Sequence, residues 1–188
     1  LVACVKDHIF IYGPPGVGKS TIGKLLAETL HLPFIDLDQQ IVQAAQKTIS
    51  KIFAEDGEAH FRSHEYTQLL QAIDNPPSVI ALGGGALVNA RNRTLAESNG
   101  RVVFLAASPE HLLDRLQKSK TVRPLIADGS VEKLEILLKQ RKEHYDDFHL
   151  RCVTDSRNPE DLIWEIQKRL GMFYITGMGK GYPVHVKP

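Results

Sequence analysis

An α/β fold, with a parallel sheet between layers of helices, is what this sequence predicts. Short apolar runs rich in β-favouring residues alternate with segments of helical period, and this order is typical of parallel sheets covered on both faces. The chain has 188 residues, 43% of them hydrophobic, which suits one globular domain with a sizeable core. A glycine-rich motif behind the first apolar run adds a phosphate-binding loop to the prediction.

Five strands are predicted, because five runs are short, apolar and rich in β-branched or aromatic residues. They are 8–12 (HIFIY), 32–36 (LPFID), 78–82 (SVIAL), 101–106 (RVVFLA) and 151–155 (RCVTD).

Helices are predicted where the apolar period changes to that of a helix or where capping residues stand. Within 18–30, the side chains of Ile22, Leu26 and Leu30 fall on one helical face. The other predicted helices are a short one from Asp38, 50–73 with a break at Gly57, 109–118 after the N-cap Ser108, 131–147, and one that begins at Asn158 and Pro159 and stops at Gly171. The segment 118–130 has no clean period and is expected to be a loop or lid.

The charge balance argues against nucleic acid or a membrane surface as a partner. There are 23 basic and 22 acidic side chains, a formal net charge of +1. No apolar run approaches the roughly 20 residues that span a bilayer, and no N-terminal signal pattern is present. Cys4 and Cys152 lack metal-type spacing, and so sparse a use of cysteine favours the cytoplasm.

The stretch YGPPGVGKS carries the most specific motif. Gly13, Gly18, Lys19 and Ser20 match G-x-x-x-x-G-K-[ST], with a strand predicted before it and a helix after it. Glycines allow backbone N–H groups to close around phosphate oxygens, and the start of the helix adds its positive end. Lys19 is suited to the β- and γ-phosphates and Ser20 to Mg²⁺. Because the loop lies near the chain start and no N-K-x-D sequence follows, a small α/β kinase is favoured over a GTPase.

The sequence DLDQ places Asp36 and Asp38 at the end of the second predicted strand. Strand residues i and i+2 face the same way, and ligands of open α/β sheets bind at the carboxyl ends of strands. One carboxylate is therefore expected to face a metal ion and the other an acceptor hydroxyl.

Several arginines and a glycine run are candidates for an acceptor site. Gly83, Gly84 and Gly85 follow the third predicted strand and permit close approach of backbone to a ligand. A single arginine is usually a solvated charge, but a set of them is suited to an anionic acceptor and to the transferring phosphate. The arginines in question are Arg62, Arg123 and Arg141.

Taken together, these residues resemble the shikimate kinase family. The match runs over about 8–170 and consists of GPPGVGKSTIGKLLA, FIDLD, IFAEDGEAHFR, LGGGAL, VRPL and SRNP. The resemblance implies a three-layer P-loop kinase fold with a five-stranded parallel sheet, helices on both faces and a mobile lid over about 118–130. It implies transfer of the ATP γ-phosphate, with Mg²⁺ as cofactor, to the 3-hydroxyl of shikimate. The products would be shikimate 3-phosphate and ADP, in the chorismate pathway to aromatic amino acids.

The resemblance also implies residue roles. Asp38 would hydrogen-bond and deprotonate the acceptor hydroxyl, Lys19 would hold phosphate, and Arg123 would move in with the lid. The ATP-binding residues would be Gly13, Pro15, Gly16, Val17, Gly18, Lys19, Ser20, Thr21, Arg115, Arg123, Arg157 and Pro159. The shikimate-binding residues would be Asp38, Phe53, Phe61, Arg62, Glu65, Gly83, Gly84, Gly85 and Arg141, with Arg62 and Arg141 on the carboxylate. Ser20 would hold Mg²⁺, and Asp36 would do so through water.

One departure from the family pattern stands near the acceptor site. After Arg141 the family usually continues R-x-P-L-Y, whereas this chain reads RKEHY, with Glu143 and His144 in place of proline and leucine. Glu143 is expected to face solvent, because a residue two positions from Arg141 lies on a different helix face.

Two other functions remain open at this level. A related small-molecule kinase, such as a gluconate kinase, would share the phosphate loop but would not need the glycine run with two carboxylate-binding arginines. A kinase-shaped binding module without turnover would lose Asp38, Lys19 or Arg123, and all three are present.

The expected kinase domain is 1–170. The segment 171–188 is glycine-rich and is a tail or linker, a docked strand, or the start of a fused domain. Because the chain begins with Leu1, a piece of a fusion with another enzyme of the pathway is an alternative. A monomer is expected, since no exposed heptad or apolar helix stands out.

Overall fold

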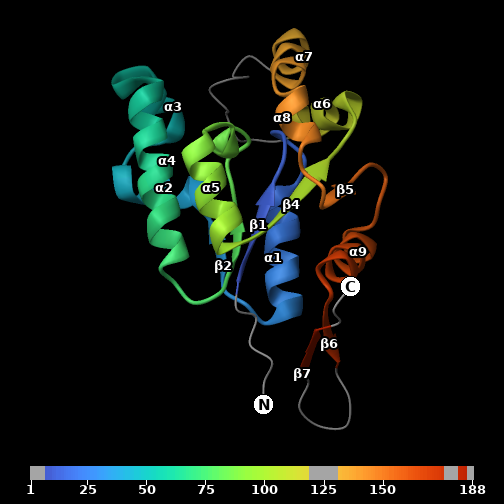
Figure 1. The fold of residues 1–188 in the computed structure, drawn as a ribbon. Coiled ribbons are helices and arrows are strands. Elements are labelled where there is room, and N and C mark those ends of the chain that lie inside the picture. The colour runs from blue at the N-terminus through green and yellow to red at the C-terminus, as the bar shows by residue number, and fades with distance from the viewer. Residues whose placement is uncertain (1–6, 119–130, 176–181, 186–188) are drawn as a thin grey trace.

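The computed structural model describes residues 7–118, 131–175 and 182–185. At its centre lies a five-stranded parallel sheet in the order β2-β3-β1-β4-β5 (Figure 1). The strands are β1 (His8–Tyr12), β2 (Phe34–Asp36), β3 (Val79–Ala81), β4 (Gly100–Ala106) and β5 (Arg151–Val153). The predicted fold class and the five parallel strands are therefore confirmed, although β2, β3 and β5 are shorter than expected.

Helices fill the connections between the strands. They are α1 (Lys19–Leu30), α2 (Leu37–Ala45), α3 (Ile49–Lys51), α4 (Gly57–Ile73), α5 (Ala90–Asn99), α6 (Pro109–Lys118), α7 (Val131–Gln140), α8 (Lys142–Asp146) and α9 (Pro159–Leu170). A π-helical turn (Ile52–Asp56) separates α3 from α4, and a 3₁₀ turn (Ala86–Val88) precedes α5. The predicted break at Gly57 is confirmed, because this residue has φ +84° where α4 begins.

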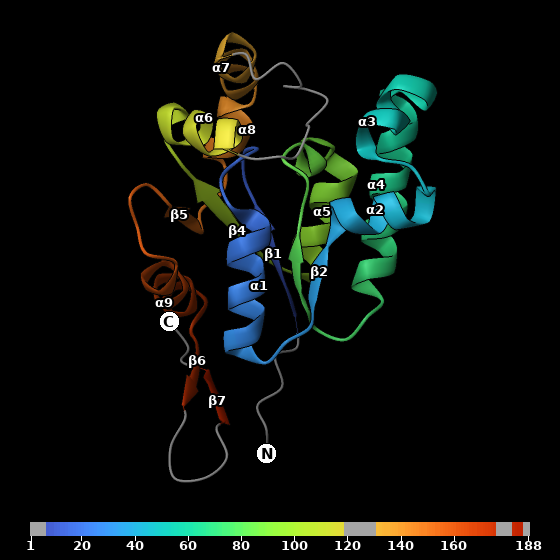
Figure 2. The same ribbon diagram turned by 180° about the vertical axis from the view of Figure 1, so that it is seen from behind.

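Two layers of helices cover the sheet, as Figures 1 and 2 show from opposite sides. The alternation of side chains along β1 decides which layer each residue meets. Ile9 and Ile11 pack in one cluster with apolar residues of α1 and α9, while Phe10 and Tyr12 pack in a second cluster with residues of α4, α5 and α8. All five β1 residues are buried, which is expected for the central strand of a sheet covered on both faces.

The helix α5 is absent from the sequence prediction. Its side chains are mostly polar, and its buried residues are Asn92 and Ala96, so the sequence has no apolar stripe that would predict this helix. The structure shows what stabilises it instead. Asn89 caps its start by accepting from the Arg91 N–H at 2.9 Å, and Arg93 pairs with Glu97 one turn later at 2.9 Å.

The segment 131–147, predicted as one helix, is two helices. The break is at Arg141, whose φ of −101° and ψ of 4° lie outside the helical range and turn the chain between α7 and α8. Apolar periodicity on both sides conceals this break in the sequence. The break is relevant to function, because Arg141 is one of the predicted ligands of the acceptor.

The end of the chain forms an antiparallel hairpin of β6 (Met172–Ile175) and β7 (Tyr182–His185). Met172 is buried and belongs to the core cluster beside α1 and α9, so the hairpin begins inside the domain that precedes it. In Figure 1 it lies at the end of the molecule opposite α7.

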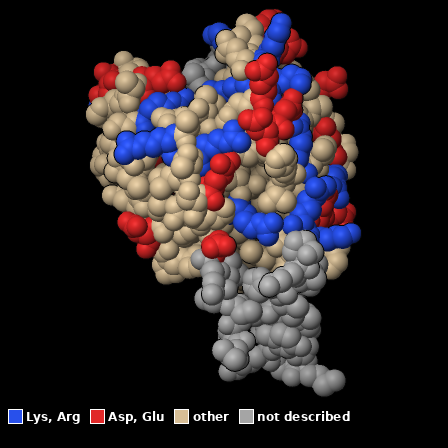
Figure 3. Space-filling view, viewed as in Figure 1, with Lys and Arg blue, Asp and Glu red and all other residues tan. Residues whose placement is uncertain are grey.

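On the face drawn in Figure 3, acidic and basic side chains are interspersed. Within the described ranges, no helix combines the length and the apolar character needed to cross a membrane.

Gly100, the first residue of β4, provides a test of this packing. A Cβ atom there would lie 2.1 Å from the His8 carbonyl oxygen, a backbone atom of the neighbouring central strand. We expect Gly100→Ala to lower the free energy of unfolding by about 2 kcal/mol or more, since overpacking a rigid region costs about 1–3 kcal/mol. Urea unfolding of Gly100→Ala beside Ser98→Ala, an exposed α5 residue expected to change stability by less than about 0.5 kcal/mol, measures the difference. Equal stabilities would mean that the two strands are less closely paired than the structure has them.

Candidate active site

The loop between β1 and α1 has the backbone geometry of an anion cradle. Gly13, Gly16 and Gly18 have φ values of +146°, +82° and +98°, which other residues rarely adopt. At Gly13 a Cβ atom would also meet the Leu105 carbonyl oxygen at 2.2 Å. No side chain caps the start of α1, so its first N–H groups are directed toward the loop as donors for an anion.

Lys19 is held across this loop. Its ammonium group donates to the carbonyl oxygens of Gly13 at 2.9 Å and Pro14 at 3.0 Å. The charge is therefore already oriented on the phosphate side of the loop, and a phosphate oxygen would take the place of a carbonyl partner.

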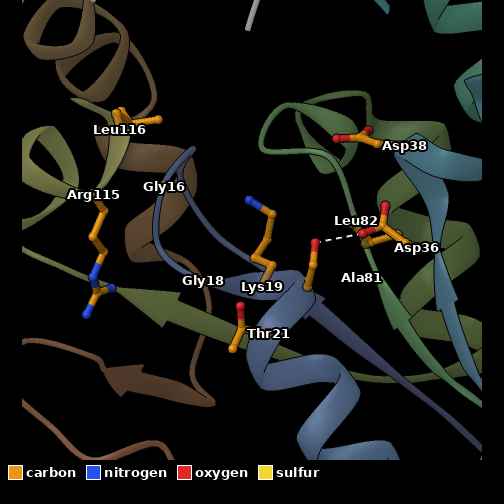
Figure 4. Close-up of a pocket in the computed structure, with 11 residues that line it drawn as sticks. Gly16, Gly18, Lys19, Thr21, Asp36, Asp38, Ala81, Leu82, Arg115 and Leu116 are labelled. Carbon is orange, nitrogen blue, oxygen red and sulfur yellow. Dashed lines mark hydrogen bonds between the residues drawn. The ribbon is translucent and has the colours of Figure 1, made fainter. Parts of the chain in front are cut away.

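Beside the loop lies a polar cavity of about 180 Å³ (Figure 4). Its lining includes loop and α1 residues on one side and the end of β2 with the start of α2 on the other. The lining residues are Gly16, Gly18, Lys19, Ser20, Thr21, Asp36, Asp38, Ala81, Leu82, Arg115 and Leu116. Asp38 and seven other predicted site residues, Gly16, Gly18, Lys19, Ser20, Thr21, Asp36 and Arg115, thus line the same cavity.

Ser20 and Asp36 form a hydrogen-bonded pair in this cavity. The Ser20 hydroxyl donates to Asp36 Oδ2 at 2.6 Å, as the dashed line in Figure 4 shows, and Asp36 Oδ1 accepts from the Gln39 N–H at the start of α2. A hydroxyl and a carboxylate are the hard oxygen donors that suit Mg²⁺, which usually keeps waters and phosphate oxygens as its other ligands. Within the described part of the chain no three His, Cys, Asp or Glu side chains gather into a protein-only metal cage, so a metal here would depend on such outside oxygens.

The reasoning that paired Asp36 with Asp38 was wrong about local structure. Asp36 is the last residue of β2, but Asp38 lies in the first turn of α2, so the two do not share a strand face. Both nevertheless line the cavity, because the helix starts at once and turns Asp38 toward the glycine run. A Cβ atom on Gly83 would lie 3.1 Å from Asp38 Oδ1 and 3.0 Å from Glu65 Oε1.

The structure brings Arg62 of α4 and Arg141 together at Gly85. A Cβ atom on Gly85 would lie 3.2 Å from Arg62 Nη2 and 3.1 Å from Arg141 Nη2, so the two guanidinium groups converge on this backbone position. Arg141 Nη1 also donates to the carbonyl of Gly84 at 3.0 Å. Two planar cations on one spot form a site for a carboxylate.

Acidic and aromatic neighbours orient Arg62. It donates to Glu65 at 3.0 Å and to Glu58 at 2.9 Å, and its guanidinium lies 5.3 Å from the ring centroid of Phe61. Phe61 in turn packs against Phe53, with ring centroids 4.7 Å apart. These predicted substrate-pocket residues therefore form one connected wall.

Glu65 has an unusual environment. The side chain is 1% exposed, and burial raises its pKa, against the opposing effect of Arg62. Its Oε1 atom has no hydrogen-bond partner among the described residues and points at Gly83. A buried, half-satisfied carboxylate of this kind is costly unless a ligand completes it.

Other predicted residues are more dispersed. Pro15 contacts the position of Gly84, and Val17 accepts from Arg115 through its carbonyl at 3.1 Å. Arg157 and Pro159 are exposed and are not among the residues that line the cavity; Arg157 pairs with Glu165. Arg123 and most of the predicted lid lie outside the described residues.

Some contributors to the site escaped the sequence reasoning. Thr154 orients Arg115 by accepting from it with both its hydroxyl, at 2.9 Å, and its carbonyl, at 3.0 Å. Tyr12 and Tyr145 both donate to the Gly84 carbonyl. Tyr12 ends β1 and Thr154 directly follows β5, and functional groups gather at such carboxyl ends of parallel strands. Tyr145 lies one turn after Arg141. These positions are the sequence features that indicate such roles. Glu143 is exposed, as predicted.

Comparison with known proteins gives a consistent result. A family model described as shikimate kinase matches residues 15–171. The shikimate kinase of Chlorobaculum parvum is 42% identical over 177 residues, which is 88% of this chain and 94% of that protein. The shikimate kinase of Enterococcus faecalis is 36% identical over 166 residues, 87% of this chain and 98% of that protein.

Among solved structures, some resemble this chain in both sequence and fold, and others in fold alone. The shikimate kinase from Acinetobacter baumannii in complex with shikimate has a TM-score of 0.80 and 34% identity, covering 88% of this chain and 94% of that one. A gluconokinase from Sinorhizobium meliloti has a TM-score of 0.56 and 16% identity, covering 86% of this chain and 89% of that one, so it shares the fold alone.

Replacing Lys19 tests the phosphate loop. We expect Lys19→Ala to weaken binding of a nucleoside triphosphate by about tenfold to a hundredfold, because charge-assisted hydrogen bonds contribute about 1.5–3 kcal/mol. Lys24→Ala, which removes an exposed lysine one turn further along α1, should bind as the unchanged protein does. Titration with a fluorescent ATP analogue measures both, and equal affinities would remove Lys19 from the site.

Proposed function

The chain belongs to the shikimate kinase family, and we propose that the cavity residues described above carry out the family's reaction. The chain is an enzyme that transfers the γ-phosphoryl group of ATP to shikimate, giving shikimate 3-phosphate and ADP in the aromatic pathway. The observation that carries the residue assignment is the convergence of Arg62 and Arg141 on Gly85, one glycine away from the wall of the phosphate loop.

The carboxylate of shikimate binds between the two guanidinium groups in this proposal. A bidentate or forked contact attracts the charge of the carboxylate and also fixes its orientation, and with it that of the ring. Phe53 and Phe61 bound the apolar side of the ring, and Glu65 holds Arg62 in place. Gly83, Gly84 and Gly85 leave room for the ring to approach the backbone closely.

Asp38 is the proposed partner of the acceptor hydroxyl. It lines the cavity beside the phosphate loop, and its Oδ1 atom lies 3.1 Å from where a Cβ atom on Gly83 would be. Its carboxylate accepts the proton of the 3-hydroxyl as the oxygen–phosphorus bond forms and the bond between the γ-phosphorus and the ADP oxygen breaks. Positioning and charge neutralisation supply most of the rate in such transfers.

The phosphate side is assigned to the loop from Gly13 to Thr21. Lys19 and the first N–H groups of α1 neutralise the phosphates, including charge that builds on the leaving ADP. Ser20, and Asp36 through water, would hold Mg²⁺, which would supply charge neutralisation to the phosphates when bound. Arg115, Arg157 and Pro159 are proposed near adenine, and Arg123 is proposed to reach the phosphates from the lid.

The setting of the enzyme is also proposed. Cys152 is buried and free, and burial raises its pKa to about 11, so it is an unreactive thiol that fits the reducing cytoplasm. We propose a monomer that takes ATP and shikimate as its small-molecule partners. The kinase domain is 1–170, with 171–188 as a tail or linker.

A coupled assay of ADP release tests the proposed function. With ATP and Mg²⁺, turnover should depend on shikimate and be absent with gluconate or with no acceptor. Turnover with gluconate would assign the chain to the sugar-acid kinases that share its fold. Binding of ATP without turnover on any acceptor would make the domain a binding module.

Asp38→Asn should separate binding from chemistry. The amide keeps the shape but loses the proton acceptor, so kcat should fall by about a hundredfold to ten-thousandfold, the scale of general-base catalysis, with the KM for ATP nearly unchanged. Glu55→Gln, which alters an exposed carboxylate on the π-helical turn, is the matched control. A kcat within a few-fold of the unchanged enzyme would exclude Asp38 as the acceptor's partner.

Arg62→Ala should act on the acceptor alone. Loss of one carboxylate contact is expected to raise the KM for shikimate by about tenfold or more, with little effect on the KM for ATP. Arg91→Ala, which removes an exposed arginine of α5 whose guanidinium lies 3.9 Å from the ring centroid of Tyr66 on α4, should change neither. If both KM values rise equally in Arg62→Ala, the carboxylate assignment is wrong.

A further inference from the structure

We propose that Tyr12 and His144 are positioning residues for the acceptor, acting through the carbonyl group of Gly84 on Arg141. This inference rests on the proposed function, since it takes Arg141 as a ligand of the acceptor carboxylate. Neither residue belongs to the motifs that indicate the reaction, and the family pattern has leucine where this chain has His144.

The Gly84 carbonyl oxygen is surrounded by donors. Tyr145 Oη lies at 2.8 Å, Arg141 Nη1 at 3.0 Å and Tyr12 Oη at 3.3 Å. A carbonyl oxygen has two lone pairs, so the two shorter bonds already use them. Any stronger donation from Tyr12 therefore competes with Arg141 and Tyr145.

Tyr12 has a second partner that decides where its proton goes. Its oxygen lies 3.1 Å from His144 Nε2, closer than to Gly84. A phenol has one proton to donate. When Nε2 carries no hydrogen, Tyr12 donates to it and Gly84 is left to Arg141 and Tyr145. When Nε2 is protonated, the imidazole donates to the Tyr12 oxygen, and the phenol proton turns to Gly84.

Close packing limits how far Gly84 can shift to relieve that competition. On its other side a Cβ position would lie 3.1 Å from Pro15 Cδ and 3.3 Å from the Gly13 carbonyl oxygen, so the residue is packed against the phosphate loop. The group with freedom to move is the Arg141 side chain. Its Nη2 atom is the one that meets Arg62 at Gly85, so a change at Gly84 is transmitted to the carboxylate site.

The surroundings of His144 keep its ring in place and discourage its charge. Aromatic rings pack around it: Tyr12 at 5.8 Å, Tyr145 at 5.8 Å and Phe148 at 5.3 Å between centroids. Burial, followed by Arg93 of α5 and then Arg141, lowers the pKa of His144, while Asp147 and Glu97 oppose this. The neutral ring is therefore the form expected above the ordinary histidine pKa of about 6.5, and the proposal takes its Nδ1–H tautomer, in which Nε2 accepts from Tyr12.

We call the contacts that run from His144 through Tyr12 and Gly84 to Arg141 the relay. It is tested with Tyr12→Phe, His144→Leu, the double variant and His144→Gln, whose side-chain amide can take the place of Nε2. We expect His144→Leu to raise the KM for shikimate by about threefold to tenfold, the effect of weakening one hydrogen bond, because the phenol proton of Tyr12 then turns to Gly84 and competes with Arg141. Tyr12→Phe has no such proton and should not show this rise. The double variant should recover toward the KM of the unchanged enzyme, because it lacks the competing donor. His144→Gln should stay within about twofold, and the KM for ATP should not change in any of them.

A packing role predicts a different result. It would lower the melting temperature and alter both KM values together, and His144→Gln would then be as impaired as His144→Leu. That pattern, or a double variant as impaired as His144→Leu, would overturn the relay while wild-type turnover with shikimate still supports the proposed function. Calorimetric titration of the same proteins with shikimate gives the affinity without turnover. If the unchanged enzyme neither binds shikimate nor turns it over, the proposed function fails and the relay fails with it.

The pH dependence is the readout that packing would not produce. As pH falls through the pKa of His144, below about 6.5, Tyr12 turns to Gly84 and competes with Arg141, so the wild-type KM for shikimate should rise. His144→Gln cannot be protonated and should lack this rise. Other groups that titrate in the range are common to both proteins, so the ratio of their KM values isolates His144. A constant ratio from pH 5 to pH 8 would overturn the proposal.

Discussion

The packing of Gly84 between the phosphate loop and Arg141 is the constraint on which the rest of the site depends. On one side its position for a Cβ atom is filled by Pro15 and Gly13, and on the other its carbonyl receives Arg141. The donor loop and the acceptor arginine are thus separated by a single residue without a side chain. A phosphoryl group must pass between substrates held within near-contact distance, and this spacing is set by backbone, which is the least deformable part of the fold.

The cationic side chains of the site form two groups, and the buried carboxylate of Glu65 lies beside one of them. Lys19 lies with the start of α1 at the phosphate loop, and Arg62 meets Arg141 at Gly85; we propose the first group for the phosphates and the second for the acceptor. Glu65 is buried beside the second group, where it holds Arg62 and keeps one oxygen without a partner among the described residues. Such a carboxylate reduces folding stability and orients a cation, a balance that is common where binding needs a fixed geometry.

The parts of this site that sequence could predict are those encoded locally. The phosphate loop is contiguous, so glycine spacing and the following helix suffice to identify it. Arg62 and Arg141 stand far apart in the chain, and their meeting depends on the break at Arg141 that apolar periodicity conceals. The helix α5 was missed because its buried side includes Asn92 in place of an apolar residue. Asp38 lines the cavity, but the sequence pattern assigned it to a strand face, whereas it lies in the first turn of α2.

The fold alone does not decide the acceptor, because a gluconokinase shares it at 16% identity. What differs must lie where the acceptor sits, at the glycine run and the residues that hold it. Arg141 and Tyr145 donate to the Gly84 carbonyl, while the phenol of Tyr12 lies between Gly84 and His144. In the proposed relay, histidine in place of the family's leucine at position 144 draws a competing donor away from this carbonyl, without altering any group that touches the substrate.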